Sequence, residues 1–145
     1  MLGIFKRGKD EGANLVEFAL LAPLLILLLF GIIEFGWLFS QNNDVKHGAR
    51  EGARAAAVNM GDFGTLVDVV CDSMDLASDV NVEFTRPGGD IGEDGEIGDT
   101  ATVAVEASPS SLSGLMDAFL PATLESMIEF RLEQPATWDD GSQSC

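Results

Sequence analysis

The sequence is poor in the residues from which active sites are built. Its 145 residues include no tyrosine, one histidine and two cysteines. No Ser/His/Asp or Cys/His constellation and no phosphate-binding loop is present, and the single histidine, His47, follows Lys46, which is typical of an exposed position. The cysteines form no CxxC pair or Cys/His cluster, so no metal site is indicated from them. We therefore expect a protein that is not an enzyme and that uses no cofactor.

Basic residues are also scarce. The chain has 8 Lys and Arg against 24 Asp and Glu, which gives a net charge of −16. After Met60, the only basic residues are Arg86 and Arg131. A domain this acidic repels nucleic acid phosphates and anionic lipid headgroups, so no nucleic acid partner is expected. The length leaves room for one anchor segment and one small domain.

One long apolar run lies near the N-terminus. No charged residue occurs between Phe18 and Ile33. When Leu15, Val16 and residues 35–39 are added, the run exceeds the roughly 20 apolar residues that a membrane-spanning helix needs. Pro23 removes one helix hydrogen bond, which membrane helices tolerate. The sequence therefore predicts a single-pass protein of the cell membrane, with the lipid bilayer as a partner.

The orientation of this span follows from its flanking charges. Lys6, Arg7 and Lys9 precede the run, and no Lys or Arg follows it until Lys46. The positive-inside bias then places the N-terminus in the cytoplasm and the C-terminal domain outside. A cleaved secretory signal is disfavoured, because the run is too long and is followed by Glu-Phe-Gly-Trp rather than a small-x-small site.

Glu17 lies at the start of the apolar run, where a carboxylate is unusual. A carboxylate at mid-membrane costs about 2.5–3.5 kcal/mol, and less near the interface. One interpretation is an interfacial glutamate hydrated among the headgroups. The other rests on spacing, since Glu17 follows Gly12 by five residues, and this pattern before an apolar helix resembles the type IV prepilin processing motif. That resemblance implies cleavage by a prepilin peptidase between Gly12 and Ala13, after which Glu17 pairs with the new terminal amine.

Three stretches, in this order along the chain, resemble one family more specifically, the TadE family. They are residues 15–25 (LVEFALLAPLL), 30–36 (FGIIEFG) and 49–56 (AREGARAA). Residues 130–133 (FRLE) also resemble the Arg-x-Glu ending of that family. The resemblance covers about the first sixty residues. It implies a minor pilin or pseudopilin of the bacterial cell envelope, acting in assembly of a Tad (Flp-type, type IV) pilus or a related secretion and adhesion apparatus. The implied partners are a prepilin peptidase, other pilins or pseudopilins, and inner-membrane assembly proteins.

Two other functions stay open at this point. The first alternative is an uncleaved bitopic structural protein of the envelope. The second is a bitopic protein whose acidic exported domain binds a cation or ligand. The candidate cation loop lies between residues 87 and 99, with Asp90, Asp94, Glu96 and Asp99 as possible calcium ligands. It departs from the EF-hand pattern, because Gly92 stands where an acidic or amide ligand belongs.

The helix is expected to continue past the membrane as far as Val58. Gly48 and Gly52 lie one turn apart, as do Ala49 and Ala53, and small residues at this spacing let another backbone approach closely. The approaching backbone belongs to the chain's own domain, to a neighbouring subunit, or to both along different faces of the helix. Glu34, at the outer edge of the span, either pairs across subunits or lies hydrated at the interface.

The remainder predicts a small pilin-like α+β domain. Alternating apolar residues predict antiparallel strands at 79–86, 100–107 and 126–133, and helical spacing predicts short helices at 65–77 and 112–119. The polar tail from Gln134 is expected to be loose unless Trp138 or Cys145 is tied down. The predicted division is a leader at 1–12, a transmembrane helix at 13–39, its exported part at 40–60 and the acidic domain at 61–145.

Cys71 and Cys145 both follow the anchor, on the side predicted to be exported. Cysteines in an oxidising compartment usually pair, so a Cys71–Cys145 disulfide is expected. The alternative is a buried Cys71 with a free Cys145.

Overall fold

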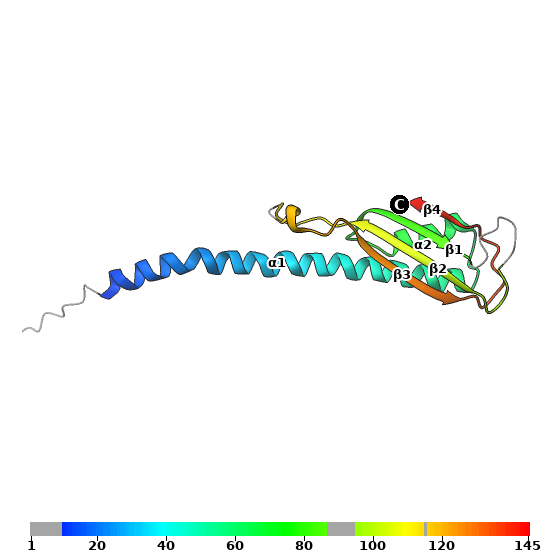
Figure 1. The fold of residues 1–145 in the computed structure, drawn as a ribbon, viewed down its shortest axis with the longest axis horizontal. Coiled ribbons are helices and arrows are strands. Elements are labelled where there is room, and N and C mark those ends of the chain that lie inside the picture. The colour runs from blue at the N-terminus through cyan, green and yellow to red at the C-terminus, as the bar shows by residue number, and fades with distance from the viewer. Residues whose placement is uncertain (1–9, 87–94, 115) are drawn as a thin grey trace, which may run out of the picture. The chain divides into compact units, whose positions relative to one another are not determined.

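The computed structural model describes residues 10–86, 95–114 and 116–145 (Figure 1). The elements in chain order are α1 (Asp10–Ala57), α2 (Phe63–Asp72), β1 (Ser78–Thr85), β2 (Thr100–Ser108), the 3₁₀ turn η1 (Asp117–Phe119), β3 (Leu124–Arg131) and β4 (Gly141–Ser144). The α+β class, with a long N-terminal helix and a small antiparallel sheet, is confirmed. The chain forms two units, Met1–Gly36 and Trp37–Cys145, and α1 continues from one into the other.

The first unit consists, in its described part, of α1 alone. Its large apolar side chains between Leu15 and Phe35 are all exposed, from 45% at Ile33 to 75% at Leu20. The helix is long and apolar enough to cross a membrane. Apolar side chains exposed on every face suit lipid rather than water, so this helix is compatible with single-pass membrane anchoring.

The second unit is built on a stripe of small residues along α1. Gly48, Ala49, Gly52 and Ala53 are all buried. A Cβ atom added to Gly52 would lie 2.5 Å from Val70 Cγ2 of α2 and 3.2 Å from Phe84 Cζ of β1. The stripe therefore faces the chain's own domain, which is the first of the arrangements left open by the sequence.

The sheet has the strand order β3-β2-β1-β4, and every neighbouring pair is antiparallel. One face of each central strand is buried, as the period-2 alternation predicts. The buried strand residues are Val80, Val82 and Phe84 of β1 and Ala101, Val103, Val105 and Ala107 of β2. They form one core with the buried residues of α1 and α2.

A fourth strand was not predicted from the sequence, and the expectation of three strands is wrong in this respect. β4 has the sequence Gly-Ser-Gln-Ser, which lacks apolar alternation and β-branched residues. It joins the sheet through backbone pairing with β1, from Asn81↔Ser144 to Phe84↔Gly141. Side-chain patterns carry no signal for a short edge strand of this kind.

The tail is tied down at three places. Trp138 is 1% exposed, and its ring centroid lies 5.7 Å from that of Phe84. Asp140 Oδ1 accepts hydrogen bonds from Arg86 Nε at 2.9 Å and from the Arg86 backbone N–H at 3.1 Å. A disulfide joins Cys145 to Cys71. The tail is thus part of the fold and not a loose end.

The helix predicted at 65–77 is displaced and shorter. Asp62 caps α2, since its Oδ1 accepts from Thr65 Oγ1 at 2.6 Å and from the Thr65 backbone N–H at 2.9 Å. These bonds lower the pKa of Asp62, and the bond from the Thr65 hydroxyl has the largest effect. After α2 ends, Asp44 Oδ2 on α1 accepts from the backbone N–H groups of Leu76 (2.8 Å) and Ala77 (3.0 Å). Asp44 thereby turns the chain into β1 where apolar spacing alone predicted more helix.

The helix predicted at 112–119 is reduced to the single turn η1. Gly114 has a φ of +75°, a left-handed conformation that interrupts a right-handed helix. The β2–β3 connection is consequently an irregular segment rather than a second amphipathic helix.

The first prediction concerns the packing of α1. Gly52→Ala should lower the free energy of unfolding by about 1–3 kcal/mol, because the new Cβ meets the stiff side chain of Val70 and overpacks the core. Gly48→Ala should cost less, since its nearest neighbour is the flexible Met74, at 2.6 Å from the added Cβ to Sδ. Gly64→Ala in α2 is the control, because its nearest contact is an ordinary 3.9 Å.

These three variants should be compared by thermal unfolding of the full chain in detergent. The melting temperature should be highest for Gly64→Ala, lower for Gly48→Ala and lowest for Gly52→Ala. A Gly52→Ala protein as stable as the Gly64→Ala control would contradict the packing described for α1.

The second prediction concerns the disulfide. Its cysteines are 74 residues apart, and closing a loop of this size in the unfolded chain is worth about 4 kcal/mol. Cys71→Ser and Cys145→Ser should therefore lower the melting temperature of the oxidised protein by similar amounts. Reductant should bring the wild type down to the level of the variants and leave the variants unchanged. A wild type from its native envelope that carries two free thiols by mass spectrometry would refute the pairing.

Candidate processing and assembly site

The predicted cleavage position lies at the start of α1. The helix begins at Asp10, so Gly12 and Ala13 belong to its first turn. Backbone N–H groups in the first turn have no intrahelical acceptor, and glycine is a poor helix former, so this turn is cheap to open. Both residues are exposed, and a Cβ added at Gly12 would meet nothing within 4 Å. The bond between Gly12 and Ala13 is accessible at the helix surface.

Glu17 is exposed on the same helix. It follows Ala13 by four residues, so the two side chains lie on one face and one turn apart. The structure thus brings Gly12, Ala13 and Glu17 together on a single accessible stretch of helix.

Glu34 differs from its surroundings. It is 6% exposed, whereas its neighbours Ile33 and Phe35 are 45% and 65% exposed. Among the described side chains from Gly12 to Gly36, it is the one that is buried. A buried carboxylate is costly unless polar groups compensate it. The two roles expected for Glu34, pairing across subunits or an interfacial position, stay predictions.

The candidate cation loop is described only at its end. Asp90 and Asp94 lie outside the described residues. The backbone N–H of Glu96 donates to Asp99 Oδ2 at 3.0 Å, and the N–H of Asp99 donates to the Glu96 carbonyl oxygen at 3.1 Å. Glu96 and Asp99 therefore close a turn. The described part of the chain contains no group of three His, Cys, Asp or Glu placed to hold a metal ion.

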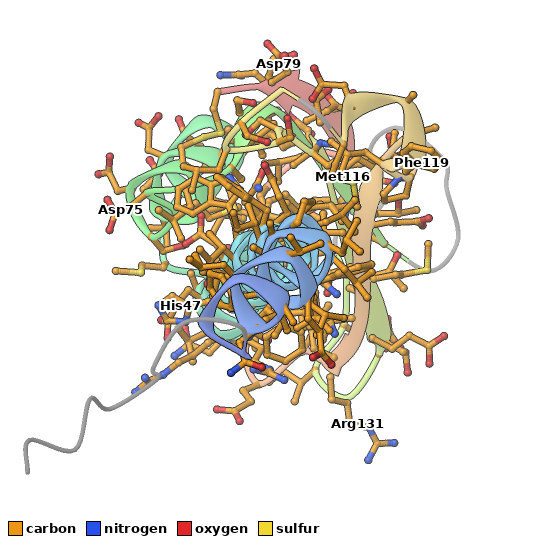
Figure 2. All side chains as sticks on the ribbon, turned by 90° about the vertical axis from the view of Figure 1, so that its left-hand side faces the viewer. His47, Asp75, Asp79, Met116, Phe119 and Arg131 are labelled. Carbon is orange, nitrogen blue, oxygen red and sulfur yellow. A yellow bond between two sulfur atoms is a disulfide. The ribbon has the colours of Figure 1, made fainter. Side chains whose placement is uncertain are left out.

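The Arg-x-Glu stretch borders a shallow cleft of about 480 Å³ between the end of α1 and β3. Arg131 Nε donates to the carbonyl oxygen of Gly98 at 2.9 Å, and the backbone N–H of Glu133 donates to that of Ala57 at 2.8 Å. The first bond joins the end of β3 to the turn before β2, and the second joins the residues that follow β3 to the end of α1. Arg131 points away from the domain (Figure 2).

The sequence did not single out two polar residues that position loops. Asp44 receives the chain after α2, as described above, and Gln41, which is 0% exposed, binds the backbone of Ser110. They lie in the polar stretch 40–44 (SQNND), where nothing in the sequence distinguishes them from their polar neighbours.

Comparison with known proteins adds one finding. Residues 12–54 match the model of a family described as TadE-like protein. The matched segment begins at Gly12, includes Glu17, Glu34 and the small-residue stripe, and ends before α2. No curated protein and no solved structure matches the chain. The segment that carries the apolar helix and the predicted processing motif is therefore similar to the TadE-like family.

Proposed function

We propose that this chain is a minor pilin or pseudopilin that is anchored in the cell membrane, is processed by a prepilin peptidase and acts in assembly of a Tad (Flp-type) pilus or a related secretion apparatus. The observation that carries the proposal is the TadE-like match over residues 12–54, which covers both Gly12 and the exposed apolar helix. Its role is structural, through contacts with other pilins, pseudopilins and inner-membrane assembly proteins.

The proposed orientation follows the charges around the helix. Lys6, Arg7 and Lys9 stay in the cytoplasm, and the acidic α+β domain lies outside. In this orientation the Gly12–Ala13 bond lies at the cytoplasmic face, where a membrane peptidase can reach it. The disulfide lies on the opposite, oxidising side.

Cleavage changes the electrostatics of the helix start. It removes the basic leader and leaves an ammonium group on Ala13. The carboxylate of Glu17 is then one turn away and close to the positive end of the helix dipole, so it neutralises both. When subunits pack, this end of the helix loses water. The buried ammonium and carboxylate groups are then stable only if they pair with each other. The partner amine belongs to the same chain or to a neighbour.

The third prediction tests processing. Gly12→Leu should leave the precursor uncut, because a peptidase site built for a small residue beside the membrane excludes a leucine side chain. Gly8→Leu, in the predicted leader, is the matched control and should still be cut. Intact-mass analysis of protein from the native host should show loss of residues 1–12 in the wild type and the control. A full-length wild-type product would instead support an uncleaved envelope protein.

The fourth prediction tests Glu17. Glu17→Gln and Glu17→Ala should still insert and be cut, but should assemble poorly. Removing one partner of a buried ion pair costs about 3–5 kcal/mol, and interfacial water reduces this, so assembly should fall by roughly tenfold or more. Asp68→Asn, which removes an exposed carboxylate from α2, should assemble as the wild type does. Normal pilus numbers with Glu17→Ala would refute the assembly role.

A further inference from the structure

The connection between β2 and β3 exposes large apolar side chains. Phe119 is 80% exposed and Leu112 is 60% exposed. Residues 109–123 contain one charged residue, Asp117, in a domain that is otherwise rich in acids. Figure 2 shows Met116 and Phe119 projecting from this segment on a different side from Asp75 and His47. Single exposed apolar residues are ordinary, but a segment with one charge that exposes two large apolar side chains indicates a contact surface.

The start of this segment is fixed to α1. Gln41 Nε2 donates to the carbonyl oxygen of Ser110 at 2.8 Å. Gln41 Oε1 accepts from the backbone N–H of Ser110 at 2.9 Å and from its hydroxyl group at 3.2 Å. Because the Gln41 side chain is fully buried, these bonds are shielded from water. The segment is therefore held at one defined height along the helix.

The position of Gln41 along α1 is close to the expected membrane surface. Gln41 follows Trp37 by four residues, which is about 6 Å along an α-helix. Trp37 lies near the end of the apolar run, which reaches Phe39, and tryptophan is enriched near the interface between membrane and water. A segment tied to Gln41 thus begins about one helix turn from the outer interface.

The charges of this segment indicate which kind of lipid surface it can contact. The segment has no basic residue, so anionic headgroups do not attract it. Its one acid is engaged, since Asp117 accepts a hydrogen bond from the hydroxyl of Ser111, whose Oγ in turn accepts from the backbone N–H of Gly114 at 2.8 Å. A carboxylate held in this way can stay at headgroup level while apolar neighbours go deeper, as in other interfacial segments.

We infer that the η1 segment, defined here as residues 112–114 and 116–119, rests in the outer leaflet of the bilayer that α1 crosses, with Leu112 and Phe119 at the boundary between headgroups and acyl chains. The occupant of this surface is zwitterionic lipid. The contact gives the exported domain a second, shallow attachment to the membrane. The inference rests on the membrane anchoring in the proposed function and is independent of cleavage and pilus assembly.

The fifth prediction is tested with full-length chain in phosphatidylcholine vesicles, with or without bromine on the acyl chains, which quenches nearby tryptophan. In a Trp37→Phe background, Phe119→Trp should give blue-shifted emission that brominated lipid quenches. Met127→Trp is the matched control, because Met127 is 62% exposed but lies on the outer face of β3, and its emission should be neither shifted nor quenched. Trp138 is buried in all variants, and the Trp37→Phe protein supplies its background.

Phe30→Trp, within the span, reports anchoring separately. If Phe30→Trp is quenched and Phe119→Trp is not, the lipid contact is refuted while the anchor stands. Blue-shifted but unquenched emission from Phe119→Trp would show that protein covers the segment, which also overturns the inference. Loss of quenching at Phe30 would refute the anchor itself. Because Phe119 is exposed, its replacement should leave the Cys71–Cys145 disulfide intact by mass spectrometry.

Discussion

The α+β domain depends on how near α1 comes to the residues that cover it. At Gly52, a missing Cβ leaves room for Val70 of α2 and Phe84 of β1. Phe84 in turn packs edge-on against Phe63, with ring centroids 6.2 Å apart, and against Trp138 at 5.7 Å. Cores are close-packed, so a displacement at Gly52 is passed through Phe84 to both neighbours. One helix position thereby sets the placement of α2, the sheet and the tail.

The two ends of α1 differ in which faces carry apolar side chains, because one end suits lipid and the other packs against a domain. Before Trp37, apolar side chains cover every face of the helix, as lipid requires. Beyond it, the buried residues narrow to one stripe, from Gln41 and Val45 to Ala56, and the opposite face carries Arg50 and Arg54. The two units divide between Gly36 and Trp37, and the boundary at 39/40 predicted for the transmembrane part stays a prediction. Sequence composition shifts gradually here, whereas packing changes within one turn.

Most of the fold could be predicted wherever a pattern repeats. The alternation in β1 and β2 and the apolar run of α1 are long enough to identify each element and its buried face. Two of the misses share a cause, which is a tertiary contact without a local signal. Asp44 ends one predicted helix from more than thirty residues away. Backbone pairing makes a strand of Gly141–Ser144. Spacing also singled out Gly12 and Glu17, whose roles stay predictions. No spacing could reveal the bonds of Gln41, because its partner Ser110 is distant in sequence.

The strand order has a kinetic consequence. β1 lies between β2 and β4, and its two partners are supplied at very different points of the chain. The β1–β2 pair can form as soon as residues 78–108 have been synthesised, but the other edge of β1 stays open until residues 141–144 follow. An open strand edge is a template for pairing with another chain. During that interval, correct folding competes with pairing between two newly synthesised molecules, and the pairing of β4 ends the competition.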